Sequence, residues 1–153
     1  MNTATGELQE IYRRRVLDHS KHPHNFRHPE TVTHEAIGFN PLCGDKLSVY
    51  LQLDNDRISD VAFEGTGCAI SVASASMMTE AVCGQSVAAA SELITAAQSI
   101  FSTGTPAENK ALQEVEALAG VSKYSSRIKC ASLAWSTLEA ALSGKTSQVS
   151  TEE

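Results

Sequence analysis

The stretch Lys46-Leu-Ser-Val-Tyr-Leu-Gln-Leu53 decides the fold, because its aliphatic side chains recur at every second position. A period of two places Leu, Val, Leu and Leu on one face of a β-strand. Strand-like runs precede and follow it at His34–Phe39 and Ile58–Glu64, and the link Asp54–Arg57 has the polar composition of a turn. The sequence therefore predicts a three-stranded antiparallel sheet with one buried face.

Helical patterns lie before and after the predicted strands in the sequence. They cover Glu7–His19, Cys68–Val82, Ser86–Phe101, Ala107–Leu118 and Ser126–Leu142. Aromatic residues make up only 5% of the chain, so the core must be built from aliphatic and small side chains that let helices pack closely on the sheet. We expect an α+β fold, a single domain over residues 1–144, and a disordered polar tail over residues 145–153.

Size and charge exclude several classes of function. The chain has 153 residues and a formal charge of −6, which offers no electrostatic footprint for nucleic acid or an anionic membrane surface. No apolar run approaches the roughly 20 residues needed to cross a bilayer, and residues 1–15 lack the apolar segment of a signal peptide. We therefore expect a cytoplasmic protein, in which four cysteines favour metal or thiol chemistry over disulfides.

Three cysteines occupy junctions between predicted elements. Cys43 lies in Asn40-Pro-Leu-Cys-Gly-Asp45, where proline and glycine indicate a loop tip. Cys68 opens a helix, where the helix dipole favours a thiolate. Cys130 follows Arg127 and Lys129 near the start of the last helix, and these cations are expected to favour its thiolate as well.

These thiols could converge on one metal ion at one end of the sheet. With Asp45 as a fourth, oxygen ligand, Cys43, Cys68 and Cys130 would make a tetrahedral zinc site. Spacing alone leaves open the alternative of three separately buried cysteines, because none of them forms a CxxC pair. Cys83 is placed outside the site, since it lies about four helical turns from Cys68.

Longer motifs around these cysteines resemble the IscU/NifU-like family, and most closely its SufU branch. The loop at residues 40–45 resembles the family's first cysteine motif. Phe63-Glu-Gly-Thr-Gly-Cys-Ala-Ile-Ser-Val-Ala-Ser-Ala-Ser-Met-Met78 resembles the second motif, and Arg127-Ile-Lys-Cys-Ala-Ser-Leu-Ala-Trp135 resembles the third. Lys129 stands where IscU-type scaffolds carry histidine, and the additional stretch around Ser102–Gly120 is similar to the SufU insertion.

The resemblance implies a zinc site formed by Cys43, Asp45, Cys68 and Cys130 and a role in sulfur transfer. SufU-like proteins accept persulfide sulfur from a SufS-like, pyridoxal-phosphate-dependent cysteine desulfurase and pass it toward downstream iron–sulfur scaffold proteins. By this resemblance, Cys43 is the sulfur acceptor, and a histidine of the partner desulfurase takes the place of Cys43 on zinc. Arg127 is given a supporting role. Two alternatives stay open: a scaffold that assembles transient iron–sulfur clusters on the same ligands, and a domain whose zinc is purely structural.

All five histidines fall within the first 34 residues: His19, His22, His24, His28 and His34. Prolines at positions 23 and 29 interrupt this segment, so no two of these histidines are expected to form an i,i+4 pair on a helix. Surface or capping roles are therefore favoured over a metal cluster.

Overall fold

A computed structural model describes residues 3–144 and 149–150 of the chain. Three antiparallel strands form most of its sheet: β1 (His34–Asn40), β2 (Asp45–Asp54) and β3 (Arg57–Thr66). The predicted three-stranded antiparallel sheet is thereby confirmed. A two-residue strand, β4 (Val149–Ser150), runs parallel to β1 at the edge and gives the order β3-β2-β1-β4.

The sequence did not indicate β4, which lies in the segment we expected to be disordered. The remaining tail residues, 145–148 and 151–153, lie outside the described part of the chain.

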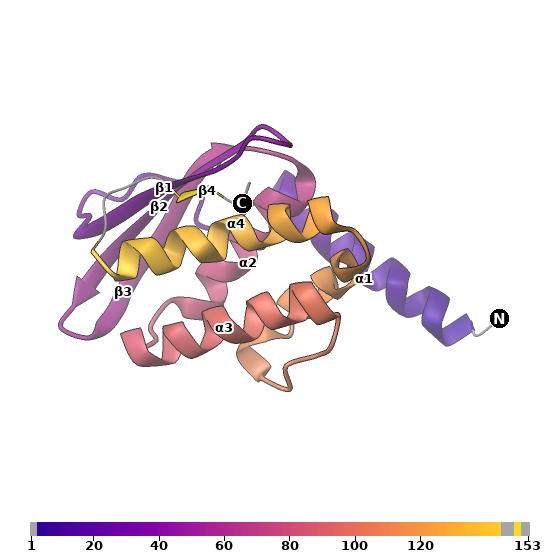
Figure 1. Cartoon of the computed structure of the whole chain (residues 1–153). Coiled ribbons are helices and arrows are strands. Elements are labelled where there is room, and N and C mark those ends of the chain that lie inside the picture. The colour runs from indigo at the N-terminus through magenta and orange to yellow at the C-terminus, as the bar shows by residue number, and fades with distance from the viewer. Residues whose placement is uncertain (1–2, 145–148, 151–153) are drawn as a thin grey trace.

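Four α-helices cover one face of this sheet and one end of it. They are α1 (Thr3–Lys21), α2 (Ala69–Val82), α3 (Val87–Thr103) and α4 (Ser125–Leu142). In Figure 1, α4 and α2 lie against the sheet, α3 lies on their outer side, and α1 projects from the end of the molecule. Leu47, Val49 and Leu51 of the central strand are fully buried beneath the helices, as their alternation predicts.

The helix predicted over Ala107–Leu118 was wrong, because this segment forms two 3₁₀-helices instead. They are η1 (Lys110–Leu112) and η2 (Val115–Lys123). Four buried side chains in this segment recur every third residue: Leu112, Val115, Leu118 and Val121. A period of three is that of the 3₁₀-helix, so this spacing keeps all four side chains on one buried face.

The interface between α2 and α4 is built from small side chains. Ala73, Ser74 and Ala75 of α2 are fully buried. The Ser74 hydroxyl donates to the carbonyl of Ala131 at 2.6 Å and accepts the indole N–H of Trp135 at 3.1 Å. These two hydrogen bonds join the facing helices and satisfy the buried indole N–H of Trp135, so α2 and α4 pack closely at this point.

Close packing on the other side of α4 leads to a prediction for Gly38 of β1. A Cβ at this position would overlap the Thr137 hydroxyl and lie 3.0 Å from Leu133 Cδ1. We expect Gly38→Ala to lower the free energy of unfolding by about 1–3 kcal/mol, measured by urea denaturation. Gly120→Ala is the matched control, because nothing lies within 4 Å of its added Cβ. An equal loss in both variants would contradict this account.

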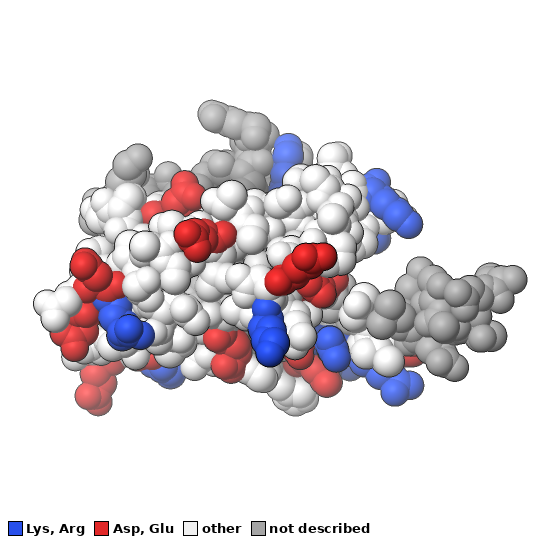
Figure 2. Space-filling model, turned by 90° about the horizontal axis from the view of Figure 1, so that it is seen from below, with Lys and Arg blue, Asp and Glu red and all other residues white. Residues whose placement is uncertain are grey.

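The charged side chains show no large patch of one sign on the face seen in Figure 2. Lys and Arg are interspersed there with Asp and Glu among uncharged residues. No helix in the described part of the chain is long and apolar enough to cross a membrane.

Candidate metal centre

The turn between β1 and β2 presents Cys43 at its tip. Asn40 and Asp45 are the last paired residues of the two strands, and Gly44 adopts a left-handed conformation with φ of +71°. The backbone N–H of Cys43 donates to the carbonyl of Asn40 at 3.2 Å, which closes the turn. Cys43 is exposed while the Asp45 side chain is buried, so one strand pair delivers both an accessible thiol and an enclosed carboxylate.

Cys68 lies across from this turn as the N-cap residue of α2. Its backbone N–H donates to Oδ1 of Asp45 at 2.8 Å. A side chain at Gly67 would place its Cβ 2.6 Å from the same oxygen, so glycine leaves the room that the carboxylate occupies. The N-terminus of α2 therefore orients Asp45, as helix N-termini commonly do for carboxylates.

Cys130 closes the group from the second turn of α4, where it is 2% exposed. Its thiol donates to the sulfur of Cys43 at 3.3 Å. Burial, followed by the hydrogen bond with Cys43, raises the pKa of the Cys130 thiol. This raised pKa disfavours the thiolate, contrary to the expectation from the neighbouring cations, and burial is its main cause. A cation bound directly to the sulfur would offset the cost of burying the thiolate.

The structure brings three of the four predicted ligands together. The sulfur atoms of Cys43 and Cys130 and a carboxylate oxygen of Asp45 all lie within 4.8 Å of one another. The Cys68 sulfur stands outside this cluster, although a side-chain hydrogen bond with Cys68 also contributes to the raised pKa of Cys130. Thiolates with one carboxylate fit zinc in a tetrahedral site, and Cys68 as the fourth ligand stays a prediction.

Asn40 is a member of the site that sequence reasoning missed. It is fully buried, and its amide Nδ2 donates to Asp45 Oδ2 at 3.1 Å and to the Cys130 sulfur at 3.4 Å. Its Oδ1 is one of two buried side-chain oxygens in the described chain without a hydrogen-bond partner. An asparagine that ends a strand three residues before a cysteine is the only signal the sequence offered.

The other residues considered from sequence are not among the three clustered ligands. The Arg127 guanidinium stacks over the Tyr124 ring, 4.5 Å from its centroid, and lines a cavity with Arg13. Its supporting role therefore stays a prediction. Cys83 is an exposed free thiol at the C-terminal end of α2, far from the Cys68 cap at the other end of the helix.

Comparison with known proteins places this geometry in context. Residues 11–148 match the family described as NifU-like N terminal domain. The chain is 43% identical to the Streptococcus pyogenes serotype M1 protein named iron-sulfur cluster assembly scaffold protein IscU, covering 91% of this chain and 87% of that protein. It is 39% identical to zinc-dependent sulfurtransferase SufU of Bacillus subtilis, covering 88% and 90% of the two chains.

A solved structure shares the same fold. It is the putative iron-sulfur cluster assembly scaffold protein for the SUF system of Fervidobacterium islandicum AW-1, with a TM-score of 0.79 and 35% sequence identity. The match covers 88% of this chain and 98% of that one.

Proposed function

Because the chain belongs to the NifU-like N-terminal domain family, we propose that it is a zinc-dependent sulfurtransferase of iron–sulfur cluster assembly. The proposed sulfur donor is a SufS-like, pyridoxal-phosphate-dependent cysteine desulfurase, and the proposed recipients are downstream iron–sulfur scaffold proteins. The B. subtilis relative bears the name of this activity. The four cysteines are free thiols, as is usual in a reducing compartment, and we propose that this compartment is the cytoplasm.

The observation that carries this proposal is the contrast between Cys43 and Cys130. Cys130 is buried in α4, whereas Cys43 is exposed on a turn, and their sulfurs lie 3.3 Å apart. A partner protein reaches Cys43 without disturbing the sheet or α4, while Cys130 and Cys68 are fixed by helices. We therefore assign Cys43 as the sulfur acceptor and Cys68, Cys130 and Asp45 as the ligands that remain in place.

The transfer step is an ordinary thiol exchange. The Cys43 thiolate attacks the terminal sulfur of the donor's persulfide, a new S–S bond forms at Cys43, and the donor cysteine leaves as a thiolate. Zinc, when bound, supplies the positive charge that keeps the Cys43 sulfur deprotonated before the donor arrives. Asn40 and the backbone N–H of Cys68 hold the Asp45 carboxylate in position throughout.

Leu42 suits the same face to protein docking. Its side chain is 62% exposed immediately before Cys43, at the tip of the turn. An apolar side chain at this point would be covered when a donor protein docks over the thiol.

A scaffold for iron–sulfur clusters is the second candidate, favoured by the name of the S. pyogenes relative. The two functions use the same ligands but differ in what they retain. A sulfurtransferase keeps zinc and carries sulfur on Cys43, whereas a scaffold holds a cluster on its cysteines.

The deciding experiment combines metal analysis with a desulfurase assay. We expect one zinc per chain in aerobically purified protein, and a large rise in the turnover of a SufS-like desulfurase on its addition. Cys43→Ala is expected to abolish the rise, because no accepting thiol remains, whereas Cys83→Ala should leave it intact. An undiminished rise with Cys43→Ala would exclude Cys43 as acceptor. No rise with the native chain, together with a stably retained iron–sulfur chromophore, would favour the scaffold.

A further inference from the structure

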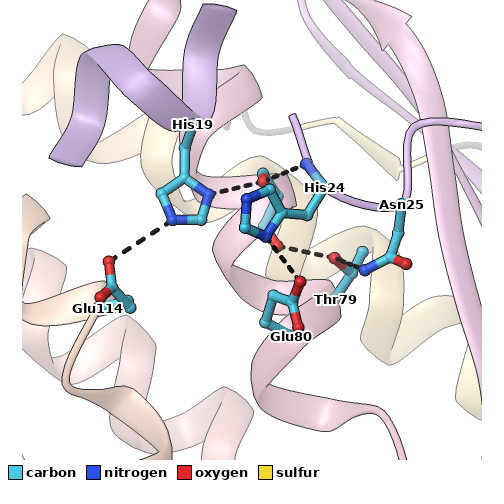
Figure 3. Close-up of polar contacts among 7 residues, drawn as sticks. His19, His24, Asn25, Thr79, Glu80 and Glu114 are labelled. Atoms are coloured by element: carbon cyan, nitrogen blue, oxygen red, sulfur yellow. Dashed lines mark hydrogen bonds and ion pairs between the residues drawn. The ribbon is translucent and has the colours of Figure 1, made fainter. Parts of the chain in front are cut away.

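Two imidazoles and three carboxylates line a surface cavity on the side of α2 away from its N-terminus. The cavity has a volume of about 520 Å³ and is lined by Arg15, Asp18, His19, His24, Glu80 and Glu114. Figure 3 shows side chains from α1, the loop after it, α2 and the start of η2 turned toward one another. The thiol cluster includes none of these residues.

His19 is the buried member of this group, with 7% of its surface exposed, so the expectation of a surface role was wrong for this residue. Its Nδ1 lies 2.7 Å from the Ser76 hydroxyl, and its Nε2 faces the Glu114 carboxylate at 3.5 Å. Burial, and then the nearby His24, lower the pKa of His19. The ring is thus held neutral and oriented through one nitrogen, which is the usual arrangement of a metal-binding histidine.

His24 is fixed beside it by the backbone. The N–H of His24 donates to the same Ser76 hydroxyl at 2.8 Å, and the neighbouring Asn25 side chain donates to Thr79 at 2.9 Å. The His24 ring lies 4.7 Å from that of His19, and its Nδ1 is 2.7 Å from Glu80. Ser76 of α2 therefore sets the spacing of two histidines that come from different segments.

The charge of the cavity favours a cation. Its lining contains three carboxylates, from Asp18, Glu80 and Glu114, against the single guanidinium of Arg15. The Glu80 and Glu114 side chains are about half exposed, so their carboxylates are free to rotate inward. Two imidazoles with two mobile carboxylates make a donor set that suits divalent transition metals.

We propose that His19, His24, Glu80 and Glu114 form a second metal site, which takes one divalent transition-metal ion. The four groups line the cavity rather than meeting at a point, so the glutamates close around the ion when it binds. This site does not rest on the proposed sulfur transfer. The alternative is that these residues only form hydrogen bonds that hold α1, α2 and η2 together. That alternative predicts that no additional ion binds.

Cobalt(II) titration of the zinc-loaded chain tests the proposal. Equilibrium dialysis should show one Co²⁺ bound per chain in addition to the zinc. The ion should display visible d–d absorption without the strong sulfur-to-cobalt charge-transfer band, since its ligands are nitrogen and oxygen. That spectral difference separates the histidine site from exchange into the thiol cluster.

Matched variants assign the ligands. His24→Gln and Glu80→Gln should each weaken Co²⁺ binding at least about tenfold. Both side chains are about half exposed, so the fold is preserved, and Gln at position 80 keeps an oxygen that accepts from His24. His28→Gln and Glu92→Gln are the controls: His28 packs on Tyr50 instead, and Glu92 is exposed on α3.

The proposal is overturned by any of three results. These are no additional Co²⁺ at millimolar concentration, an additional ion whose affinity neither His24→Gln nor Glu80→Gln changes, and a spectrum that shows only sulfur-ligated cobalt. Circular dichroism of each variant verifies that a loss of Co²⁺ is not a loss of fold.

Discussion

Cys130→Ser is expected to abolish tight zinc binding, with a loss of affinity larger than the roughly 10- to 100-fold typical of changes outside the ligand sphere. Cys130 is the most enclosed of the cysteines, and its sulfur contacts both Cys43 and Asn40. A serine oxygen at this position stays protonated at neutral pH, so the buried site loses an anionic ligand. The measurement is zinc content after dialysis, together with thermal unfolding with and without added zinc.

The effect on stability should depend on zinc. Zinc stabilises the native chain because it binds the folded state, so the native Tm should rise with zinc while that of Cys130→Ser should not respond. Cys83→Ser is the matched control, since that thiol lies at the opposite end of α2 and should leave the response unchanged. A full zinc complement in Cys130→Ser would remove Cys130 from the site.

Asp45→Asn is expected to keep the fold and to release zinc at least about tenfold faster, as a neutral amide is a weaker ligand than a carboxylate. The amide oxygen preserves the acceptor for the Cys68 N–H. The new NH₂ group would face the Asn40 amide, whose Oδ1 has no hydrogen-bond partner. If the Asn40 amide rotates by about 180°, this Oδ1 accepts a hydrogen bond from the new NH₂ group. The side chain at position 45 therefore keeps its hydrogen-bond partners, although this rotation removes the Asn40 Nδ2 hydrogen bond to Cys130, while the metal is held less firmly.

Transfer of zinc to a chromogenic chelator measures this rate. Asp54→Asn provides the control, because it lies exposed at the other end of β2. Unfolding of Asp45→Asn, with no zinc retained on the cysteines, would show that Asp45 is required for the fold and not only for holding zinc.

The local positions of the thiols were predictable because short-range rules govern them. Pro41 and Gly44 indicate the turn that carries Cys43, and Gly67 precedes a helical pattern that begins near Cys68. Convergence of the thiols was not predictable in this way. It depends on α4 crossing the sheet so that Cys130 reaches the β1–β2 turn, a contact separated by 87 residues in sequence.

Buried polar partners were the least predictable part of the molecule. Asn40 and His19 carry no local pattern that separates them from surface residues, and their partners come from distant segments. The 3₁₀ segment is a different case. The three-residue recurrence of Leu112, Val115 and Leu118 was readable in the sequence, but a helix was expected because these residues also have helical propensity.

Helix α2 carries Cys68 at its first end and Glu80 near its last. At 1.5 Å per residue these twelve steps correspond to about 18 Å along the axis. Ionic screening acts over about 8 Å in physiological salt, so charges on the solvent-exposed parts of the two sites hardly interact at this separation. Helix α2 would thus hold the thiol site and the proposed histidine site far enough apart to act independently. The thiol site would favour soft metal ions, and the histidine site would favour harder ones.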